Sequence, residues 1–262
     1  MKIYEIYDRE AGSLTGALLY YEKAETFVIE LSENLDEWRA PLLLAGLVKK
    51  GIYTVPRHLS AVWVAERIIP NTRQNVKSIL AQHKLKSYDE LKFLEISRGE
   101  CAQDALYLKP VKELPDYVCK RMQKNITECV VCEDDSLLLF FQNGEIKKVD
   151  LNSIPDTEKI LANRKLLDSA SVSAGGFSVT FLDSIDISRD ILYEKGELVP
   201  LKQSDFLGFI EKNTLDTTQC CNLLQCSRQN LTYRIKQEQL KPVRENLKGN
   251  LFLKGDVLKN SW

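Results

Sequence analysis

The sequence predicts an α+β protein, in which groups of strands and groups of helices follow one another along the chain. Two stretches of alternating apolar and polar residues, one near the start and one in the middle, are bounded by turn residues and indicate strands. Other segments have apolar residues three and four apart, the spacing of amphipathic helices. Because the strands occur in groups, antiparallel sheets covered by helices are expected.

The 262-residue chain is long enough for two or three domains, each with its own core. We predict an N-terminal α+β domain of mixed strands and helices over residues 1–113, a small α+β middle domain over 114–202 and a C-terminal domain over 203–262. The segment Leu114-Pro115-Asp116 marks the first boundary, since strand signals dominate from there to about residue 200.

Strands open the predicted N-terminal domain and helices follow them. The predicted strands cover residues 1–7, 14–21 and 26–31, and the predicted helices begin at Asn34 or Asp36, at Ser60, at Asn71 and at Ser87. These polar residues suit a helix N-cap, because their side-chain oxygens accept a hydrogen bond from a free backbone N–H group. Trp38 and Trp63 occupy core-like helical positions and are expected to be buried. This domain is also the candidate site for a protein partner.

The middle domain is predicted from strand and turn signals. Its strands are expected at residues 126–132, 136–141, 145–151 and 177–181, with a short helix at 156–162. Asn143-Gly144 is a strong hairpin signal, because both residues adopt positive φ angles at low cost. Cys129 and Cys132 lie three apart on the first strand. Their side chains are therefore expected on opposite faces, which disfavours a shared zinc ion.

Part of this middle domain resembles the bacterial domain of unknown function catalogued as family 2442. The matching segments are residues 136–141, 143–145, 149–151, 177–181, Asp186-Ile187 and Leu192-Tyr193. Domains of that family are small α+β units, and some stand directly in front of a helix-turn-helix. The resemblance therefore implies that a DNA-binding domain follows, but it does not indicate what the small domain senses.

Residues 216–257 have the spacing of a helix-turn-helix followed by a basic two-stranded wing. Thr217 or Thr218 is the expected N-cap of the first helix, which would bury Cys221 and Leu224 on one face. A tight turn then leads into the second helix. The sequence thus predicts a winged helix-turn-helix as the C-terminal domain.

The second helix is predicted to begin after Ser227 and to end before Pro242, which cannot continue a helix. Leu231 and Ile235 lie one turn apart and face the first helix. The outward face is polar, and such amides and cations bind base edges and phosphates. The predicted DNA contacts are Ser227, Arg228, Gln229, Asn230, Thr232, Tyr233 and Lys236 on this helix and its cap, and Arg244, Lys248, Asn250 and Lys254 in the wing. Arg234 lies towards the side of the helix, where pairing with acids is expected.

The C-terminal segment resembles the winged DNA-binding domain of the MerR and excisionase families. The matching residues are Ser227, Leu231, Tyr233, Pro242, Arg244, Phe252, Asp256 and Val257. In those families the second helix enters the major groove and the wing contacts the DNA backbone or the minor groove. The resemblance implies the same roles here. Gln225 stands where these families commonly have glycine, and Thr232 stands where the MerR pattern often has arginine.

Charge is distributed unevenly along the chain. Residues 212–262 hold nine Lys and Arg against four Asp and Glu, although the whole chain has a net charge of −1. A polyanion would therefore be attracted to this end, and salt would weaken its binding. We predict a sequence-specific transcriptional regulator of bacterial or phage type, which binds double-stranded DNA as a homodimer and acts as a repressor. The alternative is a non-enzymatic adaptor or inhibitor, of the phage or antitoxin type, whose helix-turn-helix docks a protein.

Enzymatic, cofactor and membrane functions find little support in the sequence. The only histidines, His58 and His83, lie outside any metal-ligand spacing, and neither a glycine-rich phosphate loop nor a nucleophile elbow occurs. A Cys101 or Cys119 nucleophile paired with His83 stays open, because such pairs meet only in space. No cofactor or metal is expected. Without a long apolar run or a signal peptide, a cytoplasmic protein with no membrane contact is expected.

Overall fold

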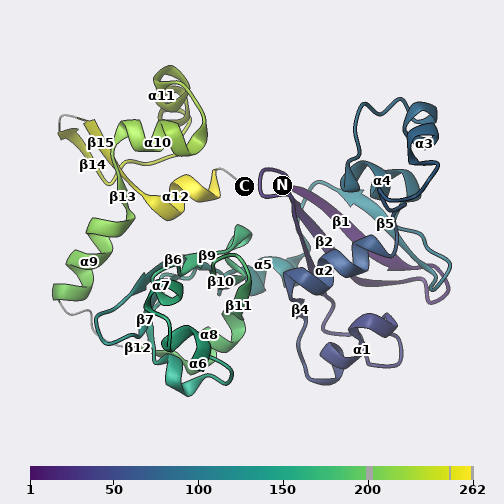
Figure 1. The fold of residues 1–262 in the computed structure, drawn as a ribbon, viewed down its shortest axis with the longest axis horizontal. Helices are drawn as coiled ribbons and strands as arrows, with labels where there is room; N and C mark the ends of the chain where they lie inside the picture. Colours follow the sequence, from purple (N-terminus) through teal and green to yellow (C-terminus); the bar gives the residue numbers. More distant parts are fainter. Residues whose placement is uncertain (199–202, 248, 261–262) are drawn as a thin grey trace. The chain divides into compact units, whose positions relative to one another are not determined.

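The computed structural model describes residues 1–198, 203–247 and 249–260 (Figure 1). The chain divides into two compact units, Met1–Cys119 and Lys120–Trp262. Both units combine helices with antiparallel sheets, which confirms the predicted α+β class. The helix α5 (Asp116–Met122) crosses the boundary between the units. Among the helices in the described ranges, none combines the length and the apolar character that a bilayer crossing requires.

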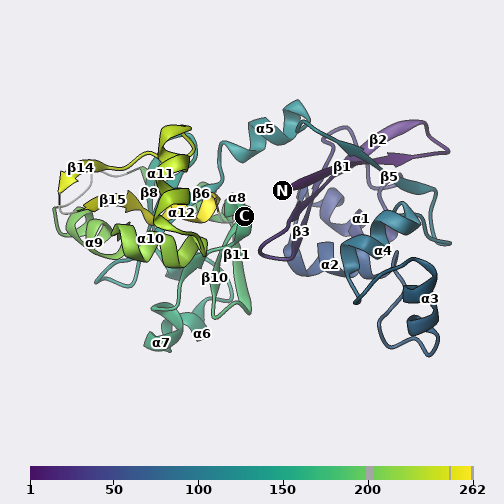
Figure 2. The same ribbon diagram turned by 90° about the horizontal axis from the view of Figure 1, so that it is seen from above.

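The first unit is a five-stranded antiparallel sheet with helices packed against one face (Figure 2). Its strands are β1 (Lys2–Asp8), β2 (Ser13–Tyr21), β3 (Thr26–Leu31), β4 (Thr54–Val55) and β5 (Leu106–Val111), in the order β4-β3-β2-β1-β5. Its helices are α1 (Leu42–Lys49), α2 (Arg57–Ala65), α3 (Val76–Gln82) and α4 (Glu90–Ser97). Alternate residues of β1, Tyr4 and Ile6, pack with Trp63 of α2 and Leu94 of α4 in one core. The three strands predicted for this region are thereby confirmed.

Helix α1 begins later than predicted, and this changes the position of Trp38. The Asp36 side chain accepts hydrogen bonds from the backbone N–H groups of Trp38 and Arg39, each at 2.9 Å, and closes an isolated turn. The helix starts only after Pro41, because the residue before a proline is biased away from helical angles. Trp38 is therefore 90% exposed, and its assignment to the core was wrong. Trp63 is buried as predicted.

The second unit begins with two antiparallel sheets that enclose a core. The strands are β6 (Ile126–Val131), β7 (Leu137–Phe141), β8 (Ile146–Val149), β9 (Ser171–Val172), β10 (Ser178–Phe181), β11 (Ile185–Ser188) and β12 (Glu197–Leu198). The short helices are the 3-10 turns η1 (Leu151–Ser153) and η2 (Ala174–Gly176) and the α-helices α6 (Glu158–Leu161), α7 (Arg164–Leu167) and α8 (Arg189–Lys195). The sheet orders are β12-β8-β7-β6 and β11-β10-β9. Leu139 of β7 packs with Val179 and Phe181 of β10 in this core.

Strand β7 is buried on both of its faces. Leu138 points away from the core between the two sheets and packs with Cys132, just after β6, and with Phe209 of α9 (Gln203–Asn213). Phe140 stacks on Phe209, with the ring centroids 4.3 Å apart. Cys129 packs in the core between the sheets, whereas Cys132 packs on the opposite face. The two thiols therefore lie on opposite faces of the sheet, as predicted.

After α9, the chain forms a pair of helices and a small sheet around a third core. The elements are β13 (Thr214–Leu215), α10 (Thr217–Leu224), α11 (Arg228–Lys236), β14 (Arg244–Leu247), β15 (Gly249–Leu253) and α12 (Lys254–Lys259), with the strand order β13-β15-β14. The buried side chains of this core are Cys220, Leu224, Leu231, Leu240, Phe252 and Val257. Two helices and a hairpin thus occur where the sequence predicted them.

Candidate nucleic-acid interface

The first helix of the pair, α10, is held at its start by a capping box. The Asp216 carboxylate accepts a hydrogen bond from the Gln219 backbone N–H at 2.7 Å, and the Gln219 side chain accepts one from the Asp216 N–H at 3.0 Å. The predicted caps, Thr217 and Thr218, were therefore wrong by one or two residues. Asp caps a helix better than Thr does, and Gln219 completes the reciprocal pair. The Thr217 hydroxyl instead accepts from the Asn250 N–H at 3.3 Å, which ties α10 to β15.

The inner face of α10 is formed by Cys220 and Leu224, which are buried one turn apart. Cys221, the residue predicted for this position, is only partly buried. Residues 220 and 224 lie one helical turn apart and therefore share the face that points to the core. Burial raises the pKa of the Cys220 thiol to about 11, and this thiol acts as a small packing group rather than as a nucleophile.

The turn between the helices is tight. Gln225 adopts a left-handed conformation, with φ 50° and ψ 44°, at the position where glycine has no steric cost. Ser227 then caps α11 as predicted, because its hydroxyl oxygen accepts a hydrogen bond from the Asn230 N–H at 3.2 Å. Leu231 is buried and Ile235 is partly buried against the same core. These contacts hold one side of α11 inward.

The opposite side of α11 is exposed and polar. Its side chains, the polar face of α11, are Arg228, Gln229, Asn230, Thr232, Tyr233 and Lys236. Gln229, Tyr233 and Lys236 are four and three residues apart and form one stripe along the helix. Within the described part of the chain, none of these three side chains has a hydrogen bond or an ion pair. Tyr233 is 58% exposed. This stripe is free to meet another molecule.

The remaining polar side chains of α11 have partners within the chain. Arg228 donates to the Thr218 hydroxyl at 3.3 Å, and the Thr232 hydroxyl donates to the Arg228 carbonyl oxygen at 2.9 Å. The Arg234 guanidinium donates to the Asn230 side chain at 3.0 Å and to the Asn260 carbonyl oxygen at 3.4 Å. Among the described residues, Arg234 therefore bonds to amide oxygens and not to the acids expected from the sequence.

The predicted wing contacts are placed less completely. The hairpin is formed by β14 and β15, with Arg244 opposite Leu251. The Arg244 side chain and the whole of Lys248 lie outside the described residues. Asn250 is half-buried in β15, and Lys254 is the first residue of α12 rather than part of the hairpin. Of the four predicted wing contacts, Asn250 and Lys254 thus have described side chains.

The positive charges of this region have few acidic partners. Over residues 212–260, the ion pair between Lys259 and Asp256, at 3.9 Å, is the one found among the described side chains. Arg228, Lys236 and Lys241 are exposed on and after α11. Cations without nearby acids attract phosphate over about a Debye length. The field at this end of the chain therefore favours a polyanion.

The sequence did not predict a buried hydrogen bond that joins α12 to β6. The Glu128 side chain of β6 is 6% exposed and accepts a hydrogen bond from the Gly255 backbone N–H of α12. A Cβ atom at Gly255 would lie 2.4 Å from the Thr127 carbonyl oxygen, so this approach requires glycine. An apolar-polar alternation on β6, with an acid at a buried position, is the only signal that the sequence carried. The contact lies away from the polar face of α11.

Comparison with known proteins finds no matching family model, no matching curated protein and no matching solved structure. Among the described residues, no group of three or more His, Cys, Asp or Glu side chains is arranged to hold a metal ion. What this region does must therefore be inferred from its own geometry and charge.

Proposed function

We propose that the chain is a sequence-specific, DNA-binding transcriptional regulator. Residues 203–262 act as a winged helix-turn-helix, in which α11 enters the major groove and the hairpin β14–β15 contacts the DNA backbone. The observation that carries the proposal is the stripe of Gln229, Tyr233 and Lys236. These side chains are exposed and unpaired within the described part of the chain. They lie on a helix whose opposite side is packed against the core through Leu231 and Ile235, so the stripe points outward.

Each side chain of the stripe suits a different part of DNA. The Gln229 amide has both a donor and an acceptor, and the adenine edge in the major groove offers the complementary pair. Lys236 has only donors and binds phosphate or guanine. Arg228, at the first turn of α11, is exposed beside them. Base contacts then come from the amide, and most of the affinity comes from the cations.

We propose further that the regulator acts as a dimeric repressor. A helix-turn-helix reads only a few base pairs, and dimers extend the site to two half-sites separated by about one or two helical turns. We also propose that residues 1–113 bind a protein partner. Two copies with twofold symmetry would require a palindromic operator.

The test is selection of bound DNA from a random pool with the full chain at moderate salt. We expect enrichment of a palindromic sequence, because twofold symmetry of the protein is mirrored in the site. Recovery of no common sequence would overturn the proposal of sequence-specific binding. Recovery of a single half-site would retain DNA reading and overturn the dimer.

A pair of variants separates base reading from phosphate binding. We expect Gln229→Ala to weaken binding to the selected site by about 1–3 kcal/mol and to relax the preference at one base pair. We expect Lys236→Ala to weaken binding to all sequences alike and to reduce the salt slope by about one. Gel shifts over a salt series measure both. Lys159→Ala, which removes an exposed cation on α6 outside this region, is the control and should change neither. Equal losses on every sequence for both α11 variants would contradict the assigned roles.

The alternative function is a protein-docking adaptor, and one observation favours it. Tyr233 on α11 and Leu223 on α10 are exposed by 58% and 38%, and exposed aromatic and aliphatic side chains are common at the centres of protein interfaces. An adaptor would give no enriched DNA. Its binding would depend on Tyr233 and hardly on salt, whereas DNA binding falls steeply as salt is added.

A further inference from the structure

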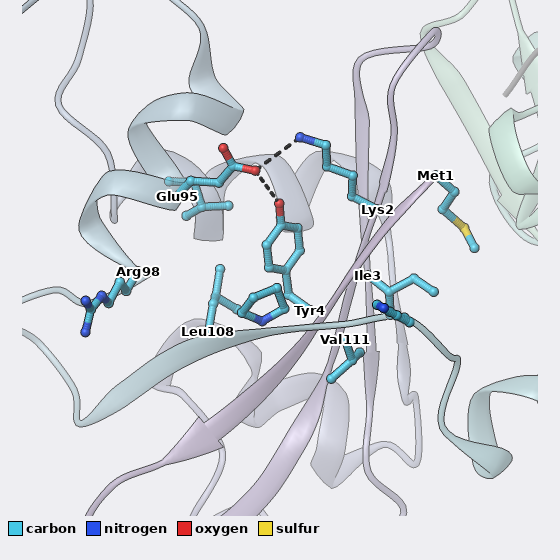
Figure 3. A pocket seen from close by; sticks show the side chains of 11 residues that line it. Met1, Lys2, Ile3, Tyr4, Glu95, Arg98, Leu108 and Val111 are labelled. Atoms are coloured by element: carbon cyan, nitrogen blue, oxygen red, sulfur yellow. Dashed lines mark hydrogen bonds and ion pairs between the residues drawn. The ribbon is translucent and has the colours of Figure 1, made fainter. Parts of the chain in front are cut away.

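The first unit contains a cavity that lies outside the proposed DNA-binding region. It has a volume of about 590 Å³ and lies between the start of β1, the end of α4 and the end of β5. Small-molecule sites in proteins span about 300–1,000 Å³, so the cavity has the size of a ligand site. Figure 3 shows Tyr4, Glu95 and Leu108 around it.

Much of the cavity wall is apolar. The apolar residues that line it are Met1, Ile3, Leu94, Leu108, Pro110 and Val111. Leu94 and Leu108 are buried from behind and are held by the core of the sheet. Leu108 packs directly against Gly99, just after α4. A Cβ atom at residue 99 would lie 2.5 Å from the Leu108 Cγ atom, so this close packing requires glycine. The wall is therefore preformed and suits an aliphatic or aromatic body.

The acid in the cavity, Glu95, is already paired with neighbouring side chains. The Glu95 carboxylate accepts hydrogen bonds from Lys2 at 3.1 Å and from the Tyr4 hydroxyl at 2.9 Å (Figure 3). Its second oxygen accepts from Lys92 at 3.0 Å, and Lys92 does not line the cavity. Hydrogen bonds from these groups hold the pKa of Glu95 below its usual value, against the opposing effect of burial. Glu95 stays charged but has little capacity left for a ligand cation.

The remaining charges of the cavity are positive. Lys2, Arg98 and Lys112 line it together with the single acid, Glu95. Arg98 and Lys112 are exposed at its rim, and neither forms an ion pair with another described residue. Three cations and one acid line the cavity, so its lining carries a net positive charge. Lys92, which lies outside the cavity, also pairs with Glu95 and adds to this excess. An anionic group at the rim would complement it.

The backbone of Arg98 is fixed beside the cavity. Arg98 caps α4 in a left-handed conformation, with φ 53°, and its carbonyl oxygen accepts a hydrogen bond from the Leu108 N–H of β5 at 2.7 Å. The helix end and the strand thus hold the Arg98 backbone in one position. A guanidinium group binds carboxylate or phosphate through two parallel hydrogen bonds.

We propose that this cavity binds an amphipathic oxyanion, a small molecule with an apolar body and one carboxylate or phosphate group. The apolar body lies along β5 against Leu108 and Val111, and the anion lies at the Arg98 end of the cavity, where the charge of Lys112 adds to the attraction. This site goes beyond the proposed DNA binding, and it would give the first unit a ligand-sensing role.

The first test is isothermal titration of the full chain at low salt with four probes that share an eight-carbon body. Octanoate and octyl phosphate carry the anion, octanol is neutral and octylammonium is a cation. We expect one anion to bind per chain, with octanol and octylammonium weaker by about tenfold or more. A stronger response to octanoate identifies the ligand class as a carboxylate, and a stronger response to octyl phosphate identifies a phosphate. Failure of both anions to saturate a site, or equal affinity for octanol, would overturn the proposal.

The second test uses variants that act on the two parts of the site separately. Arg98→Asn with Lys112→Ala removes both rim cations, and Asn tolerates the left-handed angles at residue 98. This double variant should lose about tenfold of the octanoate affinity and keep the weak binding of octanol. Val111→Phe places a larger side chain in the apolar part of the cavity and should lower the affinity of all four probes. Lys50→Ala, an exposed cation after α1, is the control for net charge and should bind as the wild type does.

These variants also provide results that would exclude the site. Unchanged octanoate affinity in the double variant would show that the rim cations do not hold the anion. Unchanged affinity in Val111→Phe would place the apolar body elsewhere. Either result overturns the assignment. DNA binding is read on a different surface, so failure of this site leaves the DNA-binding proposal intact, and the reverse also holds.

Discussion

At the scale of single residues, Glu128 is an acid of the second unit with a strongly perturbed environment. Burial raises the pKa of its carboxyl group to about 7, with Asp256 acting in the same direction. The hydrogen bond from Gly255 and the charges of Lys254 and Lys259 act in the opposite direction. An acid whose pKa is raised in the folded state binds its proton more tightly there than in the unfolded chain. Folding is therefore favoured at low pH by this group.

The pH dependence follows from that difference. The stabilisation from Glu128 is fully present below the unfolded pKa of 4.5, falls as pH rises towards about 7 and is lost above it. We expect Glu128→Gln, which stays neutral, to remove this slope and to raise the free energy of unfolding at pH 8 by roughly 1–3 kcal/mol. Urea unfolding at pH 5, 6, 7 and 8 measures it. Glu133→Gln, at an exposed acid after the same strand, is the control. A variant with the slope of the wild type would contradict the assignment.

At the scale of elements, the cap of α10 decides where the helix pair begins. We expect Asp216→Ala to lower the free energy of unfolding by about 1 kcal/mol, because it removes the acceptor for the Gln219 N–H and half of the capping box. Thr218→Ala removes only an exposed acceptor for Arg228 and should cost less than about 0.5 kcal/mol. Chemical denaturation followed by circular dichroism compares the two. A larger loss for Thr218→Ala would restore the cap expected from the sequence.

Strands were predicted more accurately than helix starts, for a physical reason. Alternation of burial along β1 and β6 records which face points to a core, and this pattern is local to the strand. A helix start is harder to predict, because several nearby polar residues can each serve as the N-cap and the sequence alone does not decide among them. Asp89 rather than Ser87 caps α4, and Asn75 rather than Asn71 precedes α3.

Within the candidate site, the sequence predicted what depends on helical spacing. Exposure of Gln229 and Lys236 and burial of Leu231 follow from the helical spacing of these residues after Ser227. The bond from Gly255 to Glu128 could not be predicted, because it joins residues 127 positions apart. Nothing in the local pattern around either residue specifies the other. Long-range contacts of this kind require the fold.

At the scale of the whole molecule, the proposed DNA-binding region is attached to the middle sheet by apolar packing as well as by Glu128. Phe209 of α9 is 7% exposed and covers Val130 and Leu138 on the outer face of the sheet. It also stacks on Phe140. This arrangement leaves the polar face of α11 uncovered in the second unit, which is what the proposed function needs.

The strength of this attachment can be measured in the full chain. We expect Phe209→Ala to lower the free energy of unfolding by about 3–5 kcal/mol, because it leaves a cavity and removes an aromatic stack. Amide hydrogen exchange should accelerate in β6 and β7. Leu198→Ala, at a side chain that is 71% exposed, is the control and should have little effect. Unchanged exchange in β6 and β7 would show that α9 does not protect the sheet.

The burial of β7 on both faces has a consequence for synthesis. Leu138 leaves the ribosome 71 residues before Phe209, the side chain that covers it. At typical translation rates of about 5–20 residues per second, the outer face of the sheet waits roughly 4 to 14 seconds for its cover. During that interval the nascent chain exposes an apolar strip, and the arrival of α9 covers it.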